Sequence, residues 1–112
     1  MKRRRYILLL VSLLMMAVQL RAQQGAEPTN GIKFFKGTFS EALAQAKQEN
    51  KIVFVDFYAV WCVPCKKMAK TVFTQEEVGK YFNEHFISLQ LDAEKGENVD
   101  IAKNYKVAAY PT

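Results

Sequence analysis

The sequence predicts an α/β fold in which a central, mainly parallel sheet is flanked by helices. Residues 52–58 form an apolar run that is interrupted only by Asp56, and residues 86–91 alternate apolar and polar side chains before Asp92. A strand that is apolar on both faces belongs at the centre of a parallel sheet covered by helices. Segments with helical periodicity precede, separate and follow these strands, and this order requires crossover connections.

The first elements expected after residue 30 are a short strand over residues 31–35 and a helix. Thr38 stands three residues before Glu41, which is the spacing of a capping box, and good helix formers continue to about Asn50. The apolar strand over residues 52–58 follows directly, so it should enter the sheet immediately after this helix.

Two further helices are expected between the apolar strand and the alternating strand. Residues 66–71 continue one helix, and Thr74 stands three residues before Glu77, which predicts a second capping box. The helix that follows this box should end near Glu84. A last short helix is expected over residues 99–105.

The net charge of +5 belongs to the N-terminal segment of the chain. Five of the 16 basic residues lie in the first 22 positions, where there is no acidic residue, and the remaining 11 basic residues balance 11 acidic ones. The one lysine cluster, formed by Lys66, Lys67 and Lys70, is short and is interpreted as a solvated helix face. The sequence therefore does not favour a nucleic-acid partner.

The N-terminal segment has the three parts of a secretory signal peptide. Basic residues 2–5 precede an apolar stretch over residues 6–20, and Ala22 provides a small residue for cleavage. The apolar stretch is shorter than the roughly 20 residues that a membrane span needs, and an uncleaved membrane anchor is the alternative. We expect export to the periplasm, an oxidising compartment. The expected organisation is a signal peptide, a linker and one domain, over residues 1–22, 23–30 and 31–112.

The only two cysteines, Cys62 and Cys65, stand at the predicted junction between the apolar strand and the next helix. Two thiols at this spacing indicate a dithiol/disulfide redox centre. Cys62 is expected at the helix N-terminus, where free N–H groups and the helix dipole favour a thiolate, and Pro64 suits the first turn. Cys65 is expected to be less exposed, so Cys62 would attack a substrate disulfide and Cys65 would resolve the mixed disulfide.

Other uses of a Cys-x-x-Cys pair have less support in the sequence. Zinc needs four ligands and an iron–sulfur cluster needs four thiolates, whereas the chain has two cysteines. Covalent haem attachment needs a histidine after the second cysteine, where this sequence has Lys66. A purely structural disulfide remains open, although so short a loop constrains the unfolded chain little. We therefore expect no metal and no cofactor.

Asp56 is the one acidic residue within the apolar strand, and two interpretations of it remain open. It points to the surface at the strand end, or it is a buried carboxylate near Cys65 that has a raised pKa and relays protons to the resolving thiol. Trp61 is interpreted either as an apolar contact surface beside the thiols or as a packing residue. His85 is interpreted as a surface residue.

Residues 55–66, together with residues 109–112, resemble the thioredoxin family. The resemblance covers residues 31–112, and the pattern at residues 72–78 and 91–93 is most similar to thioredoxin-like domains of periplasmic disulfide reductases, such as the C-terminal domain of DsbD. The resemblance implies a thioredoxin-like fold.

The resemblance also assigns roles to individual residues. It implies that Cys62 is the nucleophile, Cys65 the resolving thiol and Asp56 the buried acid. It further implies a cis-proline at Pro111 that faces the cysteines, and a backbone at Tyr110 that pairs with a substrate strand. The substrate-binding residues that it implies are Trp61, Val63, Pro64, Tyr110 and Pro111.

The sequence departs from the family pattern in three places. Val63 and Pro64 stand between the cysteines instead of the Gly-Pro of thioredoxin, so the direction of electron flow does not follow by analogy. Ser88 replaces a lysine that often accompanies the buried acid. The family continues after the cis-proline with an antiparallel hairpin and a final helix, so we expect the sequence to be a fragment whose sheet exposes an edge.

The sequence thus predicts an exported thiol–disulfide oxidoreductase that reduces or exchanges disulfides in other proteins, with Cys62–Cys65 as its redox-active disulfide. The expected partners are disulfide-containing proteins and a thiol electron donor, either soluble or bound to a membrane. We expect a monomer. The two competing hypotheses are a non-catalytic thioredoxin-fold binding module and a domain of a larger membrane electron-relay protein.

Overall fold

The computed structural model describes residues 1, 3, 4, 6 and 7 and residues 30–112. The predicted signal peptide and linker, over residues 1–22 and 23–30, therefore lie almost wholly outside the described residues, as does the alternative of a membrane anchor. None of the helices in the described part of the chain has the length and hydropathy needed to cross a membrane.

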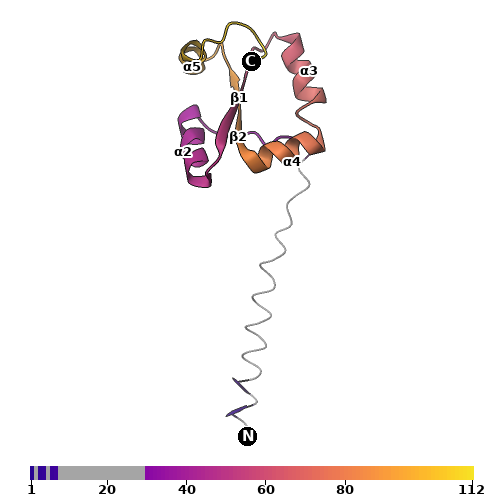
Figure 1. Cartoon of the computed structure of the whole chain (residues 1–112), viewed down its shortest axis with the longest axis vertical. Helices are drawn as coiled ribbons and strands as arrows, with labels where there is room; N and C mark the ends of the chain where they lie inside the picture. Colours follow the sequence, from indigo (N-terminus) through magenta and orange to yellow (C-terminus); the bar gives the residue numbers. More distant parts are fainter. Residues whose placement is uncertain (2, 5, 8–29) are drawn as a thin grey trace.

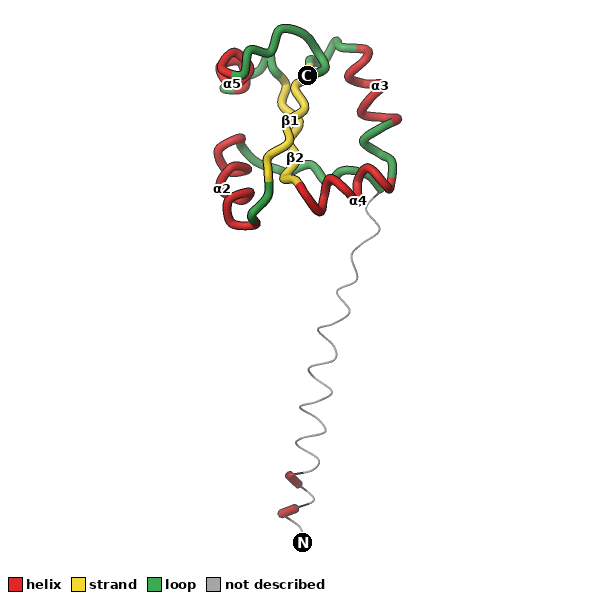
Figure 2. Tube along the Cα trace, viewed as in Figure 1, coloured by secondary structure: helices red, strands yellow, loops and turns green. Residues whose placement is uncertain are grey.

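Residues 30–112 place helices on both sides of a parallel pair of strands (Figures 1 and 2). The pair consists of β1 (Ile52–Tyr58) and β2 (Phe86–Asp92), which confirms both predicted strands. The helices are, on one side, α2 (Phe39–Glu49) and α5 (Asn98–Asn104) and, on the other side, α3 (Val63–Thr71) and α4 (Glu76–His85).

The register of the two strands brings their carboxyl ends together at one edge of the sheet. Asp56 lies opposite Gln90, and Tyr58 lies opposite Asp92. The segments that follow the two strands are joined there, because the N–H of Ala93 donates to the carbonyl of Tyr58 at 2.9 Å. This edge carries the cysteines and the groups around them.

The strand predicted over residues 31–35 is reduced to a single bridge. Phe34 forms an isolated parallel bridge with Ser88 on β2. Two residues before Phe34, the chain is hydrogen-bonded outside the sheet, because the N–H of Ile32 donates to the carbonyl of Phe73 at 2.7 Å. The segment therefore contributes one rung to the sheet and not a full strand.

The two predicted capping boxes have different outcomes. The first is confirmed, because the Thr38 hydroxyl accepts the N–H of Glu41 at 3.2 Å while the Glu41 carboxylate accepts the N–H of Thr38 at 2.8 Å. The second, between Thr74 and Glu77, is wrong. The Thr74 hydroxyl donates instead to the carbonyl of Lys70 at 2.6 Å, and α4 begins two residues after Thr74 without a side-chain cap.

The main hydrophobic core lies between the sheet and the side that carries α2 and α5. A smaller cluster surrounds the disulfide and consists of Ala59, Cys62 and Cys65, with Tyr58 and Tyr110 packed against it. The buried residues of the main core are Ala42, Ala46, Phe57, Ile87, Leu89, Leu91, Ala93 and Ala102.

The edge of β1 that faces away from β2 is largely open among the described residues. Phe57 and Thr112 exchange two backbone hydrogen bonds of 2.7 and 3.2 Å, which is the pattern of an antiparallel pair. Ile52, at the start of β1, is 70% exposed, and an apolar groove follows the edge between Leu43 and Tyr105. This edge of β1 is therefore paired only near Phe57 within the described residues.

Candidate active site

A disulfide between Cys62 and Cys65 lies at the N-terminus of α3. Cys62 is the N-cap residue of this helix, and its Sγ accepts the backbone N–H of Cys65 at 3.2 Å. Pro64 occupies the first turn, where its missing N–H leaves no helix hydrogen bond unmade. The helix therefore directs its free N–H groups and the positive end of its dipole at the sulfur of Cys62.

The expectation that Cys62 is the more exposed of the two cysteines is wrong for this disulfide state. Cys62 is 2% exposed and Cys65 is 6% exposed. Both are buried because Ala59, three residues before Cys62, and Tyr110, from near the end of the described segment, pack around them. The cysteines differ in their partners, since the sulfur of Cys62 accepts a helix N–H whereas Cys65 borders a cavity.

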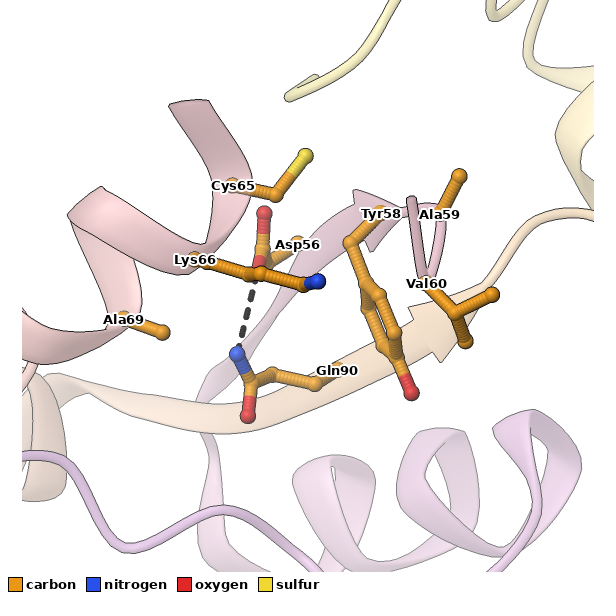
Figure 3. A pocket seen from close by; sticks show the side chains of 8 residues that line it. All are labelled: Asp56, Tyr58, Ala59, Val60, Cys65, Lys66, Ala69 and Gln90. Atoms are coloured by element: carbon orange, nitrogen blue, oxygen red, sulfur yellow. Dashed lines mark hydrogen bonds between the residues drawn. The ribbon is translucent and has the colours of Figure 1, made fainter. Parts of the chain in front are cut away.

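This cavity has a volume of about 330 Å³ and lies between α3 and the sheet (Figure 3). Its wall includes Cys65 from the helix, with Asp56 and Gln90 from the two strands. Figure 3 shows the Asp56 carboxyl and the Cys65 side chain directed toward the same space. The remaining lining residues are Tyr58, Ala59, Val60, Lys66 and Ala69.

The Asp56 side chain is buried, with 4% of its surface exposed, so the interpretation that it points to solvent is wrong. Burial raises the pKa of the Asp56 carboxyl from its ordinary value, because desolvation penalises the charged form. The Gln90 amide, which donates to Asp56 Oδ2 at 3.1 Å, opposes this rise only in part. The carboxyl thus shifts toward the state that can donate a proton.

Ser88 does not take part in this arrangement. It lies opposite Phe54 in the register, one full pleat away from Asp56, and its buried hydroxyl has no hydrogen-bond partner among the described residues. The polar contact to Asp56 comes instead from Gln90, directly across the sheet.

The surface beside the disulfide is formed by exposed apolar side chains. Trp61 is 63% exposed, and its indole N–H donates to the carboxylate of Glu94 at 2.9 Å. The Trp61 ring also meets Tyr110 edge-on, with a centroid distance of 5.9 Å. Val63 is 72% exposed and Pro64 is exposed beside it. These residues give the disulfide an apolar rim.

Tyr110 and Pro111 form the other part of this region. The peptide bond between them is cis, as the resemblance implies. Thr112 anchors the segment to β1 through its two hydrogen bonds with Phe57. Tyr110 makes no backbone hydrogen bond to any other described residue.

Two residues of this site, Gln90 and Glu94, were not predicted from the sequence. A signal for Gln90 existed, because it is one of three polar residues in β2 and lies opposite Asp56 once the strands are aligned in register. Glu94 had no local signal, since its contact with Trp61 depends on how the two loops meet after the strands. His85 is exposed, as predicted.

No group of three or more histidine, cysteine or acidic side chains in the described part of the chain is arranged to hold a metal ion. The groups that the described residues bring together at the site are a disulfide, a helix N-terminus, a buried carboxyl and an apolar rim.

Comparison with known proteins supports this description. A thioredoxin-like family model matches residues 35–112. The thiol:disulfide interchange protein DsbD of Vibrio cholerae is 33% identical over 99 residues, which make up 83% of this chain and 16% of that protein. Thioredoxin-1 of Drosophila melanogaster is 34% identical over 64 residues, which cover 57% of this chain and 55% of the relative. The chain thus spans a small part of the first and about half of the second.

Solved structures show the same fold. The solution structure of a candidate disulphide-isomerase from Bacteroides thetaiotaomicron is 48% identical, with a TM-score of 0.65 over 74% of this chain and 69% of the other. A thioredoxin from Thermus thermophilus has a TM-score of 0.64 over 72% of this chain and 61% of the other. At 23% identity, this second likeness is evidence of the fold alone.

Proposed function

Because this chain belongs to the thioredoxin-like family, whose relatives here are thiol-disulfide oxidoreductases, we propose that it reduces or exchanges disulfides in other proteins outside the cytoplasm. The observation that carries the proposal is the Cys62–Cys65 disulfide at the N-terminus of α3, with a helix N–H donated to the sulfur of Cys62. This contact favours a negatively charged sulfur at Cys62 once the disulfide is reduced.

In the first step of the proposed reaction, the Cys62 thiolate attacks one sulfur of a substrate disulfide. A bond forms between Cys62 Sγ and that sulfur while the substrate S–S bond breaks, and the second substrate sulfur leaves as a thiolate that takes a proton. Cys62 suits this role because the N–H of Cys65 is already directed at its sulfur.

In the second step, Cys65 loses its proton and attacks Cys62 Sγ. The Cys62–Cys65 bond forms, the mixed disulfide breaks, and the remaining substrate sulfur leaves as a thiolate. Two electrons have then passed from the dithiol to the substrate. Asp56 is the proposed proton relay for Cys65, because the two residues line the same cavity and burial of the Asp56 side chain raises its pKa.

We assign substrate contact to the apolar rim and to the segment beside it. Trp61, Val63 and Pro64 offer exposed side chains around Cys62, and the backbone of Tyr110 is free to pair with an extended substrate strand. Pro111 would keep that backbone beside the disulfide, as the family resemblance implies.

Each turnover leaves the dithiol oxidised, so a thiol electron donor has to restore it. The N-terminal segment has the pattern of a signal peptide, which supports a periplasmic location and a donor in that compartment or in its membrane. The likeness to one part of DsbD is consistent with such a relay.

The test is reduction of insulin disulfides with a dithiol as electron source. Replacing Cys62 by serine should abolish the activity, whereas Lys70→Ser, an exposed change on the same helix, should leave it near the wild-type rate. A redox titration should also find a reversible Cys62–Cys65 couple between roughly −300 and −100 mV. Full activity of the Cys62→Ser variant would overturn the proposal, and a chain with no reversible couple would be a binding module.

A further inference from the structure

The hydrogen bond between Trp61 and Glu94 joins the rim of the disulfide to the loop after β2. The indole N–H of Trp61 lies 2.9 Å from one carboxylate oxygen of Glu94 and 3.1 Å from the other. The acceptor is a carboxylate, and hydrogen bonds to ionised groups are stronger than those between neutral groups.

The Glu94 side chain extends from a loop whose backbone is itself held. The N–H of Glu94 donates to Asp92 Oδ1 at 3.1 Å, and the preceding residue, Ala93, is buried and hydrogen-bonded to β1. The carboxylate is therefore presented from a fixed point of the fold. Trp61, by contrast, is 63% exposed and has solvent on much of its ring.

The ring of Trp61 has two described contacts that set its direction. One is the hydrogen bond to Glu94, and the other is the edge-on contact with Tyr110, which packs against the cluster containing Cys62. A single edge-on contact leaves an exposed ring free to change rotamer. The hydrogen bond at its far end adds a second point of attachment, which favours the rotamer in which the ring lies against Tyr110.

We propose that Glu94 is a positioning residue for substrate docking, acting through Trp61. This inference rests on the proposed function and adds to it that the rim is preorganised by an acidic residue from the loop after β2. A protein substrate meets a wall that is already in place, so it does not lose binding energy in ordering the ring. A small disulfide that reaches the sulfurs without covering the rim does not depend on Glu94.

The test compares Glu94→Ala, Glu94→Gln and Glu94→Ala in a Trp61→Phe background, in the full-length protein. Loss of one such hydrogen bond should raise KM for a protein disulfide about threefold to tenfold in Glu94→Ala, with kcat within about twofold. Glu94→Gln keeps an acceptor oxygen and should restore most of the loss. Glu97→Ala, an exposed acid of the same loop, is the matched control and should behave as wild type.

A spectroscopic measurement tests the contact without relying on turnover. Trp61 is the only tryptophan, so the intrinsic tryptophan fluorescence of the chain reports on this ring alone. Time-resolved anisotropy should show faster local motion of the ring in Glu94→Ala and nearly wild-type motion in Glu94→Gln and Glu97→Ala. The rate with a small aromatic disulfide should change less than about twofold in all of them.

Two results would overturn the inference. One is unchanged anisotropy and KM in Glu94→Ala. The other is a KM effect of Glu94→Ala that persists in the Trp61→Phe background, where no indole N–H remains and Glu94 should add nothing. A wild-type protein that fails to reduce any protein disulfide would instead overturn the proposed function, and the anisotropy of Glu94→Ala would still decide whether Glu94 holds the ring.

Discussion

Cys62 and Cys65 share one disulfide, but the groups around them belong to two different environments. Cys62 caps α3, accepts a helix N–H at its sulfur and follows the exposed ring of Trp61. Cys65 lies one turn later and borders the cavity that holds the buried carboxyl of Asp56. The first environment stabilises negative charge on sulfur, and the second supplies a group that can carry a proton.

Burial alone does not distinguish the thiol that we propose to attack from the thiol that we propose to resolve. The two residues are 2% and 6% exposed, and the slightly more buried one has the helix N–H. What differs is the surroundings of each residue: the sulfur of Cys62 accepts a helix N–H, whereas Cys65 lines a cavity that Asp56 also lines. Both environments are also completed from the same place, because Gln90 lies on β2 and Glu94 lies just after it.

The largest expected effect comes from exchanging the two cysteines for serine one at a time. Cys65→Ser should still attack a substrate disulfide, because Cys62 keeps its place at the helix N-terminus, and should then accumulate as a mixed disulfide. Cys62→Ser should form at least about a thousandfold less of this adduct. Non-reducing electrophoresis with a protein substrate measures both.

If the two serine variants accumulated equal amounts of mixed disulfide, the proposed difference between the two cysteines would be wrong, because the helix N–H would not decide which cysteine attacks. Lys70→Ser, with both cysteines intact, is the control and should show no accumulated adduct. This outcome is independent of the rim, because neither cysteine variant changes Trp61 or Glu94.

The next largest effect concerns the cavity side alone. Asp56→Asn keeps the size of the side chain and an acceptor for Gln90 but removes the titrating proton. Resolution of the mixed disulfide by Cys65 should slow by about a hundredfold, since a positioned acid or base contributes on that order. Rapid-quench measurement of adduct decay tests this, with the rate of adduct formation expected to change less than about threefold.

Asp100→Asn, an exposed change in the first turn of α5, is the control for loss of an acidic residue. If Asp56→Asn slowed formation and decay of the adduct equally, the carboxyl would serve both cysteines. The division between a charge-stabilising side and a proton-carrying side would then be wrong.

The parts of this arrangement that the sequence predicted depend on local patterns. The apolar run predicted β1, and the spacing of Thr38 and Glu41 predicted the start of α2, because both signals act between residues close in the chain. The same spacing failed at Thr74, where its hydroxyl found the carbonyl of the preceding turn instead. Local signals of this kind predict well only when no other group within one helical turn competes for the same side chain.

The parts that the sequence did not predict depend on contacts between distant segments. Burial of Cys62 requires Tyr110 from the far end of the domain, and the partner of Asp56 follows only from the register of β1 and β2. Ser88 and Gln90 are equally plausible partners in the sequence, yet the register gives the role to Gln90. The cysteine pair itself was evident because its chemistry needs only two residues at one spacing.

A smaller effect is expected on stability. Burial raises the pKa of the Asp56 carboxyl above its ordinary value of about 3.8, so the folded state disfavours the ionised form. Below that value both states are protonated and wild type and Asp56→Asn should have similar unfolding free energies. As pH rises through the raised pKa of the folded state, wild type should lose stability relative to the variant, by about 1.4 kcal/mol for each unit of the rise.

Urea unfolding of the two oxidised proteins between roughly pH 3 and pH 8 measures this difference, because each pH gives one value of the difference in unfolding free energy between wild type and Asp56→Asn. A difference that stays flat with pH would show that Asp56 is solvated in the folded protein. A wild type that gained stability relative to Asp56→Asn as the pH rises would reverse the sign and would mean that a cation such as Lys66, which lines the same cavity, favours the ionised carboxyl.

The smallest effect should come from Gln90→Leu, which removes the amide donor to Asp56 and leaves the carboxyl in place. The Gln90 hydrogen bond favours the ionised form, so its loss should raise the Asp56 pKa further. The pH dependence of adduct decay should then move to higher pH, with a change of about threefold in the rate at pH 7. Gln48→Leu, on the exposed face of α2, should leave the pH profile of adduct decay unchanged.

Gln90→Leu separates the two environments most finely, because the rate of adduct formation at Cys62 should not respond to it. A profile that moved to lower pH, or a change in formation as large as that in decay, would mean that Gln90 acts on the disulfide by another route than Asp56.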